Sequence, residues 1–98
     1  MAVVHKQFIK VTDLDDVVSI EVPEGSHVLK VGNQYETMAF WYLCDEEEEK
    51  KERKWFRITG TGHRVHKDNG FLFDYIDTVQ FNDGRLVLHV FEIEEQPF

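Results

Sequence analysis

The segment from Thr59 to His66, Thr-Gly-Thr-Gly-His-Arg-Val-His, holds the residue types and spacing most suited to chemistry. A His-x-x-His pair such as His63 and His66 can supply two ligands to zinc, and Cys44 or His89 would extend the set. On an extended strand, however, residues i and i+3 point to opposite faces, and no second closely spaced pair exists. We therefore expect a tight glycine turn whose His63 hydrogen-bonds to a neighbouring strand, and no cofactor, with zinc as the alternative.

The same chemistry-bearing residues do not assemble into a recognisable catalytic motif. The glycines lack the third glycine and the following helix of a dinucleotide-binding loop. His89 lies in an apolar run, where a histidine is more often a hydrogen-bonded core residue than a catalyst. Covalent catalysis needs a nucleophile, a base and an orienting group, and no spacing of Cys44, His63 or His89 with Asp74 indicates one. The sequence predicts that the protein is not an enzyme.

Large aromatic residues gather in two segments that we predict to be adjacent strands. They are Trp41, Tyr42, Trp55 and Phe56. Cross-strand aromatic pairs stabilise a sheet by about 0.2–1 kcal/mol each, so a core role is expected for most of them. Trp41 and Trp55 are the candidates for exposed protein-binding residues, because tryptophan is enriched at interface hot spots. Aromatic residues that bind single-stranded nucleic acid work within a basic groove, which this chain lacks.

Ten consecutive charged residues run from Asp45 to Lys54, six acidic and four basic. The Glu–Lys spacing favours helix locally, but an isolated helix shorter than about 12 residues is marginal in water. The run is therefore predicted to be a flexible loop, residues 45–54, at the tip of a long hairpin. It is either a solubilising loop or an arm that contacts a partner. In the second case its protein-binding candidates are Asp45, Glu46, Glu47, Glu48 and Glu49.

Length and composition indicate one soluble domain spanning residues 1–98. Eleven basic residues against 19 acidic ones give a net charge of −8, which duplex nucleic acid and anionic membranes would repel. The single cysteine forms no internal disulfide, and a reducing compartment suits it. No apolar run reaches the roughly 20 residues of a membrane span, and the first residues lack a signal-peptide pattern. We expect a cytoplasmic protein.

The elements that must position these residues repeat with a period of two, which is typical of strands. The segment 38–44 is apolar on both faces, so we expect a central strand covered on both sides. Turn signals stand at 23–25, 32–33 and 82–84, and the last is a strong hairpin signal. The sequence predicts an all-β fold, a small antiparallel barrel or sandwich of six to seven strands. The predicted strands are 3–11, 17–22, 27–31, 38–44, 55–59, 71–81 and 85–93.

Two longer motifs connect this chain to a known group of proteins. They are Phe-Arg-Ile-Thr-Gly-Thr-Gly-His from Phe56 to His63 and Leu-Val-Leu-His-Val-Phe-Glu from Leu86 to Glu92. With the turn of Pro23 and Gly25, they resemble a family of small, uncharacterised proteins of tailed phages and prophages. The resemblance covers about residues 17–92 and includes Trp41. The acidic run is longer and more charged than the family pattern.

The resemblance implies a phage or prophage origin and no known activity. It places His63 and His89 in the two characteristic segments, where a hydrogen-bonded pair linking two strands is expected. Leu88 stands where the family usually has phenylalanine.

Charge supplies the leading functional hypothesis. An acidic surface is steered toward basic clefts, so we expect a phage-encoded protein-binding module acting on a host or phage protein with a basic surface. By analogy, its target would be a host nucleic-acid-binding or defence protein that it inhibits. Two alternatives stay open. One is a metal-binding domain that uses His63 and His66, and the other is a virion or assembly component that forms a homo-oligomer.

Overall fold

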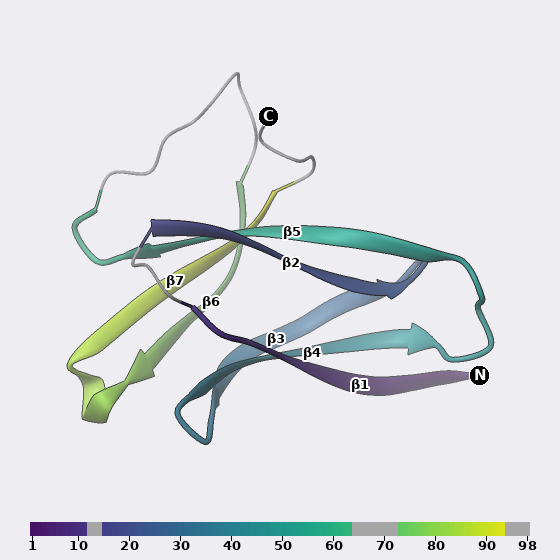
Figure 1. Cartoon of the computed structure of the whole chain (residues 1–98), viewed down its shortest axis with the longest axis horizontal. Coiled ribbons are helices and arrows are strands. Elements are labelled where there is room, and N and C mark those ends of the chain that lie inside the picture. Colours follow the sequence, from purple (N-terminus) through teal and green to yellow (C-terminus); the bar gives the residue numbers. More distant parts are fainter. Residues whose placement is uncertain (12–14, 64–72, 94–98) are drawn as a thin grey trace.

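Runs of β-branched and aromatic residues, separated by turns, build an all-β domain (Figure 1). The computed structural model describes residues 1–11, 15–63 and 73–93. Within these residues the chain forms seven strands and one 3-10 turn. They are β1 (Ala2–Ile9), β2 (Asp15–Pro23), β3 (His27–Gln34), β4 (Thr37–Asp45), β5 (Lys51–Gly60), β6 (Phe73–Phe81), η2 (Asn82–Gly84) and β7 (Leu86–Ile93). None of the helical structure in this part of the chain is long and apolar enough to cross a membrane.

The strands form two antiparallel sheets, in the orders β1-β4-β3 and β2-β5-β7-β6. The predicted all-β fold is confirmed, and the layers are those of a sandwich. Side chains that alternate along each strand fill the space between the sheets, so that Phe40 of β4 packs against Phe56 of β5. The two ring centroids are 4.7 Å apart at a tilt of 54°. Both phenylalanines are fully buried.

The acidic run does not form the tip of a hairpin, and this prediction is wrong. β4 ends at Asp45 and pairs with β1 and β3, whereas β5 begins at Lys51 and pairs with β2 and β7. The connection therefore crosses from one sheet to the other. Residues 51–54 form the first part of β5, and their partner strand β2 supplies compensating charge. For example, Arg53 lies 3.6 Å from the Glu21 carboxylate. Only residues 46–50 connect the strands.

Two of the predicted turns can be compared with the hairpins of the structure. The turn at 82–84 is confirmed, because η2 joins the paired strands β6 and β7. The turn predicted at Gly32 and Asn33 is wrong, because both residues lie within β3. The reversal occurs at Tyr35 and Glu36, whose φ angles are 56° and 57°. Neither residue type favours that left-handed conformation, so the sequence held no signal for it.

β4 is the central strand of its sheet, as predicted, but it is covered on one side only. Met38, Phe40 and Tyr42 face the core and are buried. On the other side, Ala39 is buried, Trp41 is half-buried and Leu43 is 36% exposed. Across the residues described, no element of the fold packs over this outer face. Burial within the described part of the domain therefore accounts for the inner face of β4 but not for Trp41 and Leu43 on the outer face.

Candidate functional site

The zinc candidates that the structure describes, Cys44, His63 and His89, do not form a ligand group. Cys44 is buried on β4 of the three-stranded sheet, whereas His89 lies on β7 of the four-stranded sheet. His63 is exposed just beyond β5, and His66 lies outside the described residues. Among the residues that the structure describes, no three His, Cys, Asp or Glu side chains are grouped as metal ligands would be.

The glycine turn that precedes His63 is formed as expected. The His63 backbone N–H donates to the Gly60 carbonyl at 3.2 Å, and Gly62 takes the positive φ of 83° that the turn requires. The imidazole lies against Gly60, where an added Cβ would approach Cδ2 to 3.2 Å. Glycine at position 60 therefore makes room for the histidine ring.

His89 is held by threonines and does not pair with His63, which corrects the expected pair. Its Nε2 lies 2.7 Å from Thr61 Oγ1, and its Nδ1 lies 3.0 Å from Thr78 Oγ1. Thr78 Oγ1 also lies 2.7 Å from the Tyr75 hydroxyl. Both ring nitrogens are thus occupied, and the histidine connects the turn after β5 to β6. This arrangement is a structural tie between strands.

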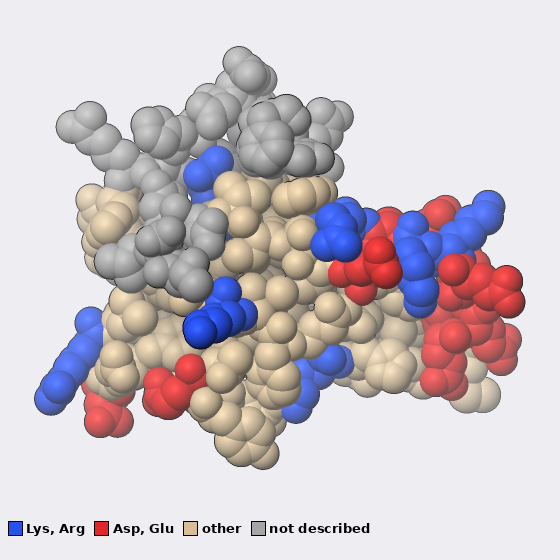
Figure 2. Space-filling model, in the orientation of Figure 1, with Lys and Arg blue, Asp and Glu red and all other residues tan. Residues whose placement is uncertain are grey.

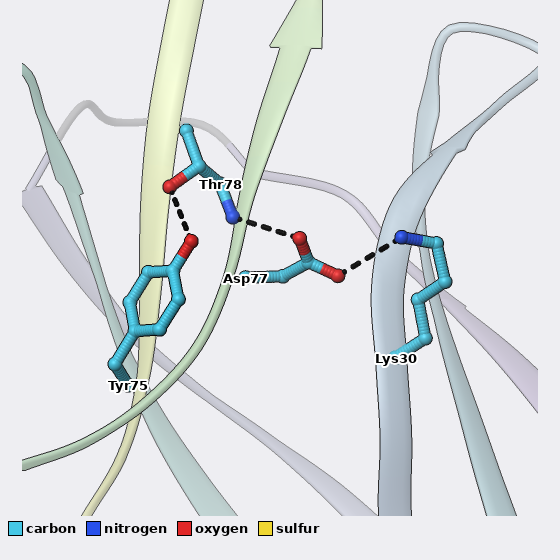
Figure 3. Close-up of polar contacts among 4 residues, drawn as sticks. All are labelled: Lys30, Tyr75, Asp77 and Thr78. Atoms are coloured by element: carbon cyan, nitrogen blue, oxygen red, sulfur yellow. Dashed lines mark hydrogen bonds and ion pairs between the residues drawn. The ribbon is translucent and has the colours of Figure 1, made fainter.

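The tie continues to the other sheet (Figure 3). The Thr78 backbone N–H donates to Asp77 Oδ1 at 3.0 Å, and Lys30 Nζ lies 3.1 Å from Asp77 Oδ2. Lys30 belongs to β3 and Asp77 to β6, so this ion pair joins the two sheets. Each lies beside a shift in strand register, at Val28/Lys30 and at Tyr75/Asp77. The bulges turn the two charged side chains toward each other.

The predicted aromatic pairing between neighbouring strands is wrong, because β4 and β5 belong to different sheets. Tyr42 and Phe56 are core residues. Trp55 is half-buried on β5. Trp41 is also half-buried but lies on the outer face of the three-stranded sheet, over Gly32, where an added Cβ would approach its ring to 3.3 Å. Trp41 therefore remains a binding candidate.

The acidic residues of the predicted loop gather with those of the β2–β3 turn. The Glu24 backbone N–H donates to the Lys50 carbonyl at 2.8 Å, which brings the turn beside the β4–β5 connection. We call this region the acidic end; its carboxylates are Glu24, Asp45, Glu46, Glu47, Glu48 and Glu49. Figure 2 shows Asp and Glu side chains concentrated where β4 ends, among several Lys and Arg. These residues are exposed, except Glu48, which is half-buried.

Backbone donors favour the charged form of one carboxylate of the acidic end, Asp45, and of its neighbour on β5, Glu52. The Glu47 N–H and the N-terminal ammonium lower the pKa of Asp45. The Gly25 N–H, which donates to Glu52 at 2.8 Å, lowers the pKa of Glu52, and Lys54 adds to the effect. The turn and the strand start are thereby fixed to each other. Asp45 and Glu52 are thus the carboxylates of this region that backbone hydrogen bonds hold in place.

Beside the acidic end, the outer face of the three-stranded sheet carries a row of apolar side chains. The register sets Val4 opposite Leu43 and Lys6 opposite Trp41, with Phe8 on the same face. Val4 and Phe8 are 54% and 45% exposed. We call Val4, Phe8, Trp41 and Leu43 the apolar strip. An exposed group of large apolar side chains with nothing packed on it is typical of an interaction surface.

Comparison with known proteins places the chain in a family without assigning it an activity. A family model described as a domain of unknown function (DUF7352) matches residues 1–97. The chain belongs to the DUF7352 family. The predicted membership of an uncharacterised family is thus confirmed, and the match spans both sheets. Neither curated proteins nor solved structures give a match.

The apolar strip of this DUF7352 domain was missed when the sequence was considered alone. Val4 and Phe8 alternate with Lys6 in the first strand, which is the pattern of a half-exposed strand, but the alternation does not say which face is covered. Their proximity to Leu43 depends on the pairing of β1 with β4. The useful signal was the two-sided apolar character of segment 38–44.

Proposed function

We propose that this protein is a protein-binding module that contacts its partner through the apolar strip and the adjoining acidic end. The observation that carries the proposal is the outer face of β4. Its alternate residues Trp41 and Leu43 are apolar, yet the face is left uncovered by the described residues. Trp is a frequent hot-spot residue, and a strand face supplies a rigid support for it.

The position of the charge indicates the chemistry of the partner. Leu43 and Asp45 lie on the same face of β4, two residues apart, so the strip runs directly into the acidic end. Beside the strip on β1, Lys6 hydrogen-bonds to Gln34, and its ammonium lies 4.8 Å from the Phe8 ring centroid. A complementary partner would present apolar side chains bordered on one side by Lys and Arg. Its binding should be steered by charge and weakened by salt.

The resemblance to tailed-phage proteins supports a more specific form of the proposal. A phage-encoded protein with this surface would act on a basic host protein and inhibit it by covering a nucleic-acid-binding or defence surface. The acidic end would compete with phosphates for the same Lys and Arg side chains.

The test begins with proteins captured from a host lysate by the immobilised chain and continues with each purified candidate by calorimetry. The double substitution Phe8→Thr and Leu43→Thr keeps β-propensity and should lower the affinity for the true partner at least tenfold. The matched control is Tyr75→Thr, which removes an aromatic residue that is 59% exposed on the other sheet. It should leave the affinity unchanged.

Two results would overturn the proposal. One is a purified partner whose affinity falls with Tyr75→Thr but not with the double variant. The other is sedimentation showing that wild type is a dimer that the double variant dissociates, because the strip would then be covered by a second copy. Raising the salt from about 50 to 300 mM should weaken the proposed complex, since exposed charges are screened over a Debye length of roughly 10 Å.

A further inference from the structure

A pocket of about 450 Å³ opens between the sheets, at the ends of β1 and β4 that lie away from the acidic end. Its floor is apolar and belongs to the core, with Met38 and Leu88 each 2% exposed and Phe81 8% exposed. Ile9 and Leu86 add apolar walls. The volume lies within the range of about 300–1,000 Å³ that small-molecule sites have.

The rim of the pocket is built from two unusual turns. Glu36 and Asn82 line the pocket, and their φ angles are 57° and 51°. Tyr35 and Asp83, beside them, are also left-handed, at 56° and 55°. Asn and Asp tolerate this conformation, whereas at Tyr35 and Glu36 it costs free energy and persists where the surroundings enforce it, often at functional sites. The strained residues therefore stand in one of the two turns that shape the rim.

Hydrogen bonds enforce this geometry. The Asn82 N–H donates to the Glu36 carboxylate at 3.2 Å, which joins the two turns across the rim. The Glu36 N–H donates to Asn33 Oδ1 at 2.9 Å, and Asn33 Nδ2 donates to the Gln80 carbonyl at 2.9 Å. The rim is therefore a connected frame, and the pocket is largely formed before any ligand arrives.

The charges at the rim select the ligand. Lys10 lines the pocket and is exposed, and no ion pair engages it within the part of the chain that the structure describes. The Glu36 carboxylate also lines the pocket, and the Asn82 N–H donates to it. Lys10 is the cation among the lining residues, and it lies beside an apolar cavity. We propose that this pocket binds a small carboxylic acid whose apolar chain or ring enters the cavity and whose carboxylate meets Lys10.

Octanoate and 1-octanol are suitable probes, since they share an apolar chain and differ in charge. Binding is followed by NMR chemical shifts of backbone amides. For about ten non-hydrogen atoms at modest ligand efficiency, a Kd on the order of 1 mM is expected for octanoate. The shifts should centre on Ile9, Lys10, Met38 and Leu86. Shifts centred on other elements, or none at 10 mM, would overturn the assignment.

Variants separate the cavity from the cation. Lys10→Met should lower the affinity for octanoate about three- to fivefold, as expected for the loss of an exposed ion pair, and should leave the affinity for octanol unchanged. Lys6→Met, four residues before Lys10 and outside the pocket, is the matched control and should change the binding of neither probe. Leu86→Trp should fill the cavity and abolish both, with thermal unfolding used to confirm that the variant is folded. Equal effects of the two lysine variants would contradict the role of Lys10.

This inference is independent of the proposed protein-binding function. Phe8 and Leu43 do not line the pocket, so Phe8→Thr with Leu43→Thr should bind octanoate as wild type does. Loss of partner binding and loss of octanoate binding are therefore distinguishable.

Discussion

Replacing Tyr35 by asparagine is expected to stabilise the protein. Tyr35 and Glu36 form the two-residue loop between the paired residues Gln34 and Thr37, and both have positive φ. This is the pattern of a type I′ turn, in which asparagine is favoured at the first central position because its side chain tolerates the left-handed region. Tyr35 is 85% exposed, so its ring contributes little buried surface that the substitution would lose.

The magnitude follows from the backbone angle. A left-handed conformation costs an ordinary L-residue about 1–2 kcal/mol, and asparagine recovers part of this cost. We expect the free energy of unfolding to rise by about 0.5–1 kcal/mol. In a domain of this length that corresponds to a rise in Tm of about 2–8 °C. Urea unfolding and calorimetry measure the two quantities, and the m-value should not change.

Tyr35→Ser is the matched control, because it removes the same ring without favouring positive φ as strongly. The Tyr35→Asn variant should be more stable than Tyr35→Ser, and the free energy of unfolding of Tyr35→Ser should be close to that of wild type. If asparagine and serine melt together, at or below wild type, Tyr35 is not strained. The argument that the rim of the pocket stores strain would then fail at this position.

Three further predictions concern the contacts that hold the fold. The Gly25 N–H lowers the pKa of Glu52, so this carboxylate contributes stability that is present above its unfolded pKa near 4.5 and is lost as pH falls through its folded pKa. In acid-unfolding titrations, the stability difference between wild type and Glu52→Gln should therefore shrink below about pH 4.5. His89→Leu removes both imidazole hydrogen bonds and should cost about 1–2 kcal/mol in urea unfolding; a change within 0.3 kcal/mol, on the order of measurement error, would refute the tie. Phe40→Leu should cost about 1–2 kcal/mol by loss of the ring pair with Phe56, and an unchanged midpoint would contradict the tight packing of the two rings.

The sequence predicted strands well because alternation is a local property. The β6–β7 hairpin was found from its turn residues, and the central position of β4 from its two apolar faces. Sheet pairing was not predictable, because the partner of a strand depends on the whole domain. The acidic run illustrates this limit. Residues 51–54 resemble a loop by composition, yet β2 places Glu21 close to Arg53 and the segment continues as strand.

The candidate site was predictable only in its residue types. Trp41 was named as a possible contact residue, but its surroundings were assigned to the wrong sheet. His89 was singled out by its motif, and its threonine partners could not be inferred because Thr61 and Thr78 reach it from different parts of the chain. One rim turn, at 82–84, was predicted, whereas the other depends on φ angles that Tyr35 and Glu36 rarely adopt, so the pocket itself was not predictable.

The two ends of the sandwich differ in a way that bears on function. At the acidic end, the turn residue with positive φ is Gly25, so the tight geometry there carries little strain. At the pocket end, Tyr35 and Glu36 occupy positions that Asn and Gly would suit better. Glu36 has a structural reason, because its carboxylate accepts from the Asn82 N–H. Among the described residues, no comparable tertiary contact holds the Tyr35 ring, which is 85% exposed, so the stability of the fold does not explain why tyrosine stands at this position.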